Sequence, residues 1–308
     1  MSKINSAEGF VAFIDILGYK QICHQSKDIQ NNVLDFIQAA ADKAYNKCMD
    51  SFFDDNDNPK DHGGTFTCDD FTKDDFPFEK ITPLLISDSL VLSLQFTDKD
   101  NWCSTFCDAC TFFTFVQKLF MEMFNAGLPP RGAICCGEYH TTKTTMSGLP
   151  LVRAHELAES LRLSGIALTL HLENKILDDV FGEQKCLVDL FKDEKSLLIK
   201  HKTTTKMWEN GKETLFIIPP MGDLKFEIYP YVYSKFTEYG KSIDDERVYH
   251  KFENTVAFFA ASRKEYEDRM NAAKKWMEDF MSRRQEEPIK RKPKTLAEVL
   301  GINKNEQE

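Results

Sequence analysis

The chain has 308 residues, 42% of them hydrophobic and 29% charged, which is typical of a folded protein with one large domain, or one domain with an appendage. No apolar run approaches the roughly 20 residues of a membrane-spanning helix, and the N-terminus lacks the pattern of a signal peptide, so we expect a cytoplasmic protein without membrane partners. The net charge of −10 argues against a general nucleic-acid surface, because phosphate backbones require clustered Lys and Arg. A bound divalent metal would still allow a small anionic substrate.

Nine cysteines are present, an odd number without disulfide-like spacing. Cys103, Cys107 and Cys110 follow an i, i+4, i+7 spacing, which places them on one face of a helix. Free cysteine is among the most buried residue types, so this pattern favours a buried helix face over a metal cluster.

The first quarter of the chain predicts a strand, a turn and a helix. Residues Gly9 to Ile16 are apolar and β-prone, with Leu17 and Gly18 as a turn. Apolar positions from Lys27 to Met49 follow helical spacing. Residues 50–80 are rich in Asp, Asn, Gly and Pro, which indicates a flexible surface insertion; DDNDNPKDHGG within it only partly matches a calcium-binding loop.

The middle of the chain predicts alternating strands and helices. The expected elements are a strand or hairpin over Leu84–Phe96 that carries Asp88, a helix over Asn101–Asn125, a strand over Arg131–His140 and a helix over Pro150–Leu163.

The last third predicts four short strands and then helix. The strands are expected over 166–172, 196–201, 214–218 and 229–234, and a long helix over 244–284. Basic residues from Lys290 to Lys294 read as a solvated linker before a short helix that begins at Thr295. This order predicts α+β or α/β packing in a domain over 1–240, followed by a helical C-terminal extension over 241–308.

Two aspartates at strand ends are the strongest chemical signal. Asp15 lies between Ile14 and Ile16 in an apolar strand, where a carboxylate costs several kcal/mol unless a cation pairs with it. A structural arginine could be that cation. Together with Asp88, however, Asp15 suits magnesium, which binds a few carboxylates plus substrate phosphates. The Leu17-Gly18-Tyr19 turn could cradle those phosphates with backbone N–H groups.

The order of four motifs resembles the catalytic domain of class III nucleotidyl cyclases. The family's F-x-D-I-x-G-F start is matched by residues Phe13–Tyr19, and its second metal aspartate by Ser87–Ser89. Its R-x-G-i-x-x-G strand is approximately matched by Arg131–Gly137, where glycine follows the arginine directly. Its G-x-x-V-N-x-A-x-R helix corresponds to Gly148–Glu156, and the resemblance covers roughly residues 9–235. It implies a ferredoxin-like sheet with flanking helices.

By this resemblance, Asp15, Asp88 and the Ile16 carbonyl hold two Mg²⁺ or Mn²⁺ ions. Arg131 reaches the triphosphate, beside Gly18 and Tyr19. The metals would help the ribose 3′-hydroxyl to displace pyrophosphate from the α-phosphate. The resemblance also implies a homodimer whose protomers complete each other's sites.

Several positions depart from the family pattern. Val152 stands where the family has its transition-state asparagine, and Glu156 where it has an arginine. Their replacements are left open among three cations, Arg153, Arg162 and Lys143. Leu84 and Thr145 occupy the places of the residues that read a purine base. A site built to hydrogen-bond one base rejects another, so their loss predicts a changed substrate.

These departures resemble the pyrimidine cyclases of Pycsar antiphage defence. That resemblance implies conversion of UTP or CTP to cyclic UMP or cyclic CMP, a messenger for a separate effector protein. Two alternatives remain open: a purine nucleotide cyclase, and a degenerate cyclase-fold regulator that binds nucleotide without turnover.

Overall fold

The computed structural model describes residues 4–25, 27–52, 80–86, 88–142, 144–169, 172, 199–204, 212–218, 220 and 226–286. Most of the expected insertion (53–79) and the basic tail from 287 lie outside these residues. The chain divides into two compact units, Met1–Tyr266 and Glu267–Glu308, and every described strand belongs to the first.

The described strands form one mixed sheet of eight, in the order β2-β3-β1-β4-β6-β8-β7, with β5 paired to β4 off this path. The strands are β1 (Asn5–Ile16), β2 (Thr82–Ile86), β3 (Ser89–Gln95), β4 (Pro130–Thr141), β5 (Met146–Ser147), β6 (Ile166–Leu168), β7 (Ile199–Thr204) and β8 (Lys212–Ile218). Only β4 and β6 pair in parallel among these neighbours. A parallel pair needs a crossover, and α4 (Leu149–Ser160) lies in that connection. With its flanking helices, this sheet confirms the predicted α+β fold class.

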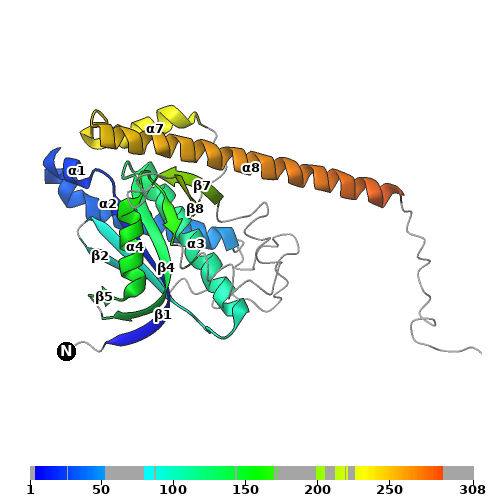
Figure 1. Cartoon of the computed structure of the whole chain (residues 1–308), viewed down its shortest axis with the longest axis horizontal. Coiled ribbons are helices and arrows are strands. Elements are labelled where there is room, and N and C mark those ends of the chain that lie inside the picture. Colours follow the sequence, from blue (N-terminus) through cyan, green and yellow to red (C-terminus); the bar gives the residue numbers. More distant parts are fainter. Residues whose placement is uncertain are drawn as a thin grey trace, which may run out of the picture. The chain divides into compact units, whose positions relative to one another are not determined.

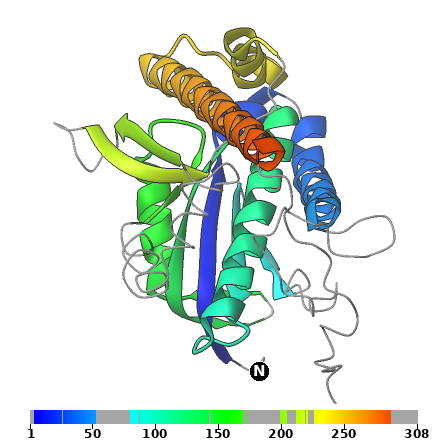
Figure 2. The ribbon, with the colours of Figure 1, turned by 90° about the vertical axis from the view of Figure 1, so that its right-hand side faces the viewer.

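The two faces of the sheet carry different helices. α2 (Lys27–Phe52) and α3 (Trp102–Asn125) cover one face, and α4 covers the other (Figure 2). Successive side chains of a strand point to opposite faces. In β1, Ala12 and Ile14 therefore join the large core under α2 and α3, whereas Val11 and Phe13 face the α4 side. Asp15 has the same parity as Phe13, so its side chain belongs to the α4 face.

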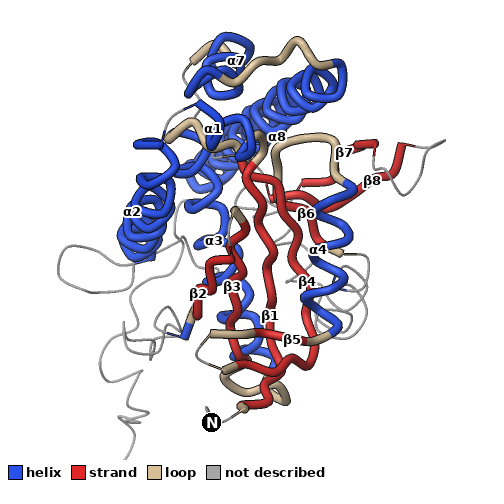
Figure 3. The backbone as a smooth tube through the Cα atoms, turned by 90° about the vertical axis from the view of Figure 1, so that its left-hand side faces the viewer, coloured by secondary structure: helices blue, strands red, loops and turns tan. Residues whose placement is uncertain are grey.

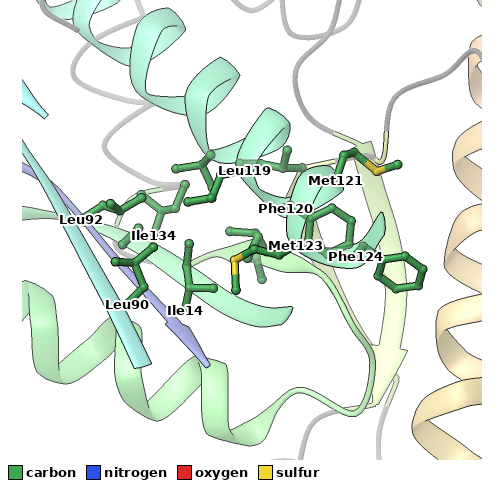
Figure 4. Packing of buried hydrophobic residues seen from close by; sticks show 14 of the residues in the cluster. Ile14, Leu90, Leu92, Leu119, Phe120, Met121, Met123, Phe124 and Ile134 are labelled. Carbon is green, nitrogen blue, oxygen red and sulfur yellow. The ribbon is translucent and has the colours of Figure 1, made fainter. Parts of the chain in front are cut away.

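α3 contributes several of the largest side chains of the large core. Phe112, Phe113, Phe120 and Phe124 are fully buried along this helix. Figure 4 shows this helix packed over the apolar side chains of the central strands. Burial of one such side chain contributes about 1.5–3 kcal/mol, so these four phenylalanines contribute strongly to the packing of α3 on the sheet.

Two helices follow the sheet, α7 (Ile228–Thr237) and α8 (Glu246–Glu286), joined through the short η4 (Glu238–Gly240). α7 and the part of α8 up to Tyr266 pack at one end of the sheet (Figure 3). The expected strand over 229–234 is wrong, since these residues lie in α7. Tyr and Val there favour a strand, but Val232 and Phe236 are four residues apart and are buried together on one helical face. Tertiary packing therefore overrides local propensity.

The other expected elements lie within a few residues of their expected bounds where they are described. β6 is shorter than expected and ends at Leu168. Of the described helices, none has both the length and the apolar character of a membrane span. The cysteines Cys48, Cys107, Cys135 and Cys136 are buried thiols outside any disulfide, and no group of three or more metal-binding side chains occurs among the described residues. Figure 1 gives the element labels along the chain.

Candidate active site

The register of three neighbouring strands gathers the predicted site residues at the end of β1. Asp15 lies opposite Ser89 on β3 and opposite Arg131 on β4. Asp88 directly precedes Ser89, in the turn between β2 and β3. A register shift of one residue in either pairing would place the side chain of Asp15 on the opposite face of the sheet from those of Ser89 or Arg131. The alternation of buried apolar residues in β1 therefore fixes the register that brings these residues together.

Asp15 and Arg131 form an ion pair on the α4 face. The Nε of the guanidinium donates to the carboxylate oxygen Oδ2 at 2.9 Å, and Nη2 lies 2.9 Å from the same oxygen. Its Nη1 also donates to the backbone carbonyl of Glu159, in the last turn of α4, at 3.1 Å. The side chains are only 17% and 12% exposed, so the pair is largely removed from water. Arg131 thus links the end of β1 to α4.

Burial raises the pKa of Asp15, and Arg131 opposes that rise without cancelling it. The negative charge of Asp88 raises the pKa further, and the positive charge of Lys251 lowers it. Asp88 and Lys251 are therefore within electrostatic reach of Asp15. Two carboxylates at one strand end repel each other, and a divalent cation between them would relieve that repulsion.

The turn after β1 is fixed by its backbone. Gly18 has φ of 81°, in the left-handed region that favours glycine, and its carbonyl accepts hydrogen bonds from the N–H groups of Gln21 and Ile22. Burial raises the pKa of Tyr19, as do the neighbouring Cys23 and the charge of Asp88. Tyr19, directly after this turn, is therefore within electrostatic reach of Asp88.

The carbonyl of Ile16 faces the Asp88 side. The N–H of Leu17 donates to Pro129 at 2.9 Å, so Ile16 and its partner Pro130 form a non-hydrogen-bonded pair. The backbone groups of Ile16 then point away from β4, toward the β3 side of the strand. Its side chain is buried on the opposite face, in the large core.

The oxygen donors of these residues are of the kind that magnesium and manganese bind. Asp15 and Asp88 supply two carboxylates, and the Ile16 carbonyl faces the same side. Magnesium is commonly bound by one or two carboxylates with substrate phosphates and water completing its shell, so a cage of three acidic side chains is not required. One oxygen of Asp15 already accepts from Arg131, and a metal ion would have to share this carboxylate with the guanidinium.

The two expected base-reading positions do not join this group. Leu84 packs against the small apolar cluster of Val11, Val91 and Tyr139. Thr145 is exposed, and its hydroxyl hydrogen-bonds that of Thr142 at 2.7 Å, beside β5. β5 pairs with β4 at His140, which is nine positions beyond Arg131 (140 minus 131). At about 3.3 Å per residue, Thr145 lies roughly 30 Å from Asp15 in the same chain.

The three cations expected as replacements are not gathered at Asp15 either. Arg153 is close enough to Cys135, further along β4, to lower the pKa of its thiol. The backbone carbonyl of Arg162 accepts a hydrogen bond from Asn254, and its side chain is exposed. Lys143 lies outside the described residues. Val152 and Glu156 are both exposed on α4.

A cation that the motifs do not reveal comes from α8. Lys251 lies within electrostatic reach of Asp15, although 236 positions separate them in the sequence (251 minus 15). The signal that could have found it is the helical spacing of Val248, Phe252 and Thr255, which shows the buried side of α8 near Lys251 but not what that side packs against.

Comparison with known proteins gives little support beyond the geometry. The sequence matches no protein-family model and no curated protein. Among solved structures, similarity is found to the adenylyl cyclase CyaB from P. aeruginosa, with 10% identity and a TM-score of 0.39 over 72% of this chain and 99% of that one. A guanylyl cyclase is similar with 8% identity and a TM-score of 0.32, over 73% of this chain and 96% of that one. Both scores are too low to carry an argument about activity.

Proposed function

We propose that this protein is a nucleotidyl cyclase that uses Asp15 and Asp88 as metal ligands. The observation that carries the proposal is the juxtaposition, fixed by strand register, of these two aspartates with Arg131 at the end of β1. Two carboxylates, a guanidinium and a glycine turn form a combination suited to a polyphosphate and divalent cations.

In the proposed reaction, the 3′-hydroxyl oxygen of a nucleoside triphosphate forms a bond to the α-phosphorus. The bond from that phosphorus to the oxygen bridging to the β-phosphate breaks, pyrophosphate leaves and the hydroxyl proton is released. Mg²⁺ or Mn²⁺ ions held by Asp15, Asp88 and the Ile16 carbonyl would polarise the α-phosphate and acidify the hydroxyl. Arg131 offers a planar set of donors for the negative charge of the phosphates.

The proposed substrate is UTP or CTP. The support is the chemistry of the two base-reading positions: Leu84 is apolar and Thr145 carries only a hydroxyl, so neither offers the charged partner expected for a purine edge. Conversion to cyclic UMP or cyclic CMP, and a role of that product as a signal to a separate effector in antiphage defence, follow from the family resemblance and belong to the same proposal.

A homodimer is proposed with it. Because Thr145 lies roughly 30 Å from Asp15 within one chain, a site that uses both must take Thr145 from a second copy. Leu149 and Val152 on α4 are large apolar side chains that are 57% and 49% exposed, which suits a surface for such a contact.

A second candidate function has one observation in its favour. Arg131 already neutralises Asp15 within the chain, so Asp15 has a partner in the absence of metal. A cyclase-fold protein that binds a nucleotide or another protein without turnover would be consistent with that ion pair.

The test is incubation of the protein with each of the four nucleoside triphosphates and Mn²⁺, with detection of cyclic nucleotide and pyrophosphate. Asp15→Asn and Asp88→Asn should each abolish the product while the far-ultraviolet circular dichroism stays unchanged. Asp35→Asn, at an exposed position of α2, is the matched control and should keep full activity. Activity in the Asp15 or Asp88 variant would overturn the metal assignment, and inactivity of the wild type with all four substrates would favour the binding function.

A further inference from the structure

A cavity of about 170 Å³ lies beside the β1–α1 turn, where α1 is Tyr19–Gln25. Its lining comes from that turn, from the residue before β4 and from the segment that follows the sheet. We call it the lysine cavity. Its lining residues are Leu17, Gly18, Lys20, Gln21, Pro129, Phe236, Lys241, Val248 and Lys251. Three of these nine are lysines and none of them is acidic, in a chain whose net charge is −10. Such a reversal of the local charge favours an anion.

Lys241 is a buried wall of this cavity. It is 6% exposed, and its Nζ donates to the carbonyl of Gly127 at 2.6 Å. Its aliphatic stem packs against Gly18, where an added Cβ would come within 3.0 Å of the lysine Cδ. Burial lowers the pKa of Lys241 to about 8, and a bound anion would favour its charged form. Burial of an ammonium group costs free energy unless the group is paired with an opposite charge and hydrogen-bonded, and a bound anion would provide such a charge.

Lys251 is directed to the cavity by the packing of α8. One turn further along the helix, the Thr255 hydroxyl accepts a hydrogen bond from the N–H of Ser164 at 2.8 Å. Asn254 donates to the carbonyl of Arg162 at 2.9 Å, and Phe252 is fully buried. These three neighbours fix the rotation of α8 about its axis, and with it the direction of Lys251.

The cavity adjoins the candidate active site. Leu17 and Gly18 line it, and they directly follow the strand end that carries Asp15 and Ile16. Lys251, which also lines it, lowers the pKa of Asp15 by its charge. A polyphosphate whose α-phosphate sits at the two aspartates could therefore extend past Gly18 toward the lysines.

We propose that the lysine cavity binds the β- and γ-phosphates of the nucleoside triphosphate, with Lys251 of α8 as the principal phosphate ligand and Lys20 as a second. The helix after the sheet thus supplies a substrate-binding group to its own chain's site. The inference rests on the proposed cyclase function for the identity of the anion, while the site itself is a polyphosphate site. Lysine acts there as a point charge on phosphate oxygens, without the bidentate geometry of arginine.

The test compares Lys251→Gln with Lys264→Gln, an exposed lysine of the same helix that does not line the cavity. Two quantities are measured: the Kd of inorganic tripolyphosphate by calorimetry, and the KM for UTP with Mn²⁺. Lys251→Gln should raise both by about tenfold or more, which corresponds to ~1.4 kcal/mol of binding free energy, while kcat falls less. Lys20→Gln should raise them by about threefold, and Lys264→Gln should leave both within about twofold.

The outcomes separate this inference from the proposed function. One outcome is that tripolyphosphate binding depends on Lys251 but the protein forms no cyclic nucleotide. That result supports the polyphosphate site and contradicts the proposed cyclase function. Cyclase activity with an unchanged KM in Lys251→Gln overturns the inference and leaves the cyclase standing. If Lys251→Gln has a lowered melting temperature, Lys251→Arg decides, because it keeps the charge and should retain binding to within about threefold. Loss of binding in the arginine variant at wild-type stability would also count against a phosphate role.

Discussion

Arg131 donates one hydrogen bond to Asp15 from Nε and another from Nη1 to the last turn of α4, and its Nη2 lies 2.9 Å from the same oxygen of Asp15. The same guanidinium therefore holds the candidate metal ligand and links it to the helix that covers this face of the sheet. Because this pair is largely buried, removal of either partner leaves a group whose charge is poorly solvated. The ion pair is consistent with both candidate functions. In a cyclase it would be a preformed part of the active site, and in a binding protein without turnover it would replace the metal as the partner of Asp15.

Replacement of Arg131 by Met should raise the pKa of Asp15 further, because burial and Asp88 both act in that direction and the main opposing charge is lost. The expected result is a loss of cyclase activity of at least about 100-fold, with the acid limb of the pH–rate profile shifted to higher pH. Arg131→Lys should retain more activity, since it keeps a positive charge but cannot contact both Asp15 and Glu159 with the fixed geometry of the guanidinium. Steady-state rates across pH measure both effects. An unshifted acid limb in the Met variant would show that Asp15 does not control it.

Asp15 should make the metal-free protein less stable as the pH rises. Its pKa in the folded state is raised above the ordinary value of 3.8, so the folded state binds the proton more tightly than the unfolded state does. The stabilising effect of that proton is fully present below pH 3.8 and is lost as the pH rises through the folded-state pKa. Urea unfolding of wild type and Asp15→Asn over that range should give a difference that grows with pH in favour of the variant.

Two observations would decide that experiment. Saturating Mn²⁺ should reduce the difference at neutral pH, because the metal binds only the wild-type carboxylate pair. A constant difference between the two proteins at all pH values would mean that Asp15 titrates alike in the folded and unfolded states. Asp108 also has a pKa raised by burial, and it is common to both proteins, so its contribution cancels.

Mixing experiments should locate the two halves of the proposed shared site. Asp15 and Arg131 are bonded within one chain, so Asp15→Asn mixed with Arg131→Ala should stay inactive. A change on α4, Glu156→Ala, is expected to be inactive by itself if α4 serves the partner's site. Mixed with Asp15→Asn it should recover about a quarter of wild-type activity, because half of randomly formed dimers are mixed and each has one intact site of two. Sedimentation of the same mixtures checks the dimer. Recovery in the first mixture, or full activity from a monomer, would refute the shared site.

A competition assay with UTP, CTP, ATP and GTP at equal concentrations should yield pyrimidine products at least about tenfold over purine products, a preference of ~1.4 kcal/mol in the transition state. Between the two pyrimidines we expect UTP, from the family resemblance. The double variant Leu84→Lys and Thr145→Asp restores charged partners for a purine edge and should narrow the preference. Dominance of cyclic AMP or cyclic GMP with the wild-type protein would leave a cyclase but remove the pyrimidine assignment.

Local sequence patterns predicted the parts of the site that lie at strand ends. An apolar run broken by Asp15 and a hairpin around Asp88 are visible in a single sequence, because alternation and turn residues are local. The sequence indicates only that some arginine could pair with Asp15. It does not identify Arg131, because strand register is not a local property. Lys251 was missed for the same reason, as only the docking of α8 brings it near.

The mistaken strand over 229–234 has a related cause. Tyrosine and valine favour extended structure, and the burial of Val232 and Phe236 on one side of α7 depends on what the helix packs against. The family resemblance implied the roles of Leu84 and Thr145, and the structure separates Thr145 from Asp15 in one chain. Which copy completes a site is a question of assembly, and the composition of one chain cannot answer it.

The buried thiols provide a set of probes for local unfolding of the elements that carry them. Cys48 lies on α2, Cys107 on α3 and Cys135 on β4, so three elements each carry a reporter that reagents reach only when the surrounding structure parts. Burial raises the pKa of Cys48 and of Cys135, which slows their reaction further in the closed state. The rate at which each thiol is alkylated in the native protein therefore measures the opening equilibrium of its own element. Ligands that order the end of β1 would be detected by slower labelling of Cys135, with no need for the reaction to be known.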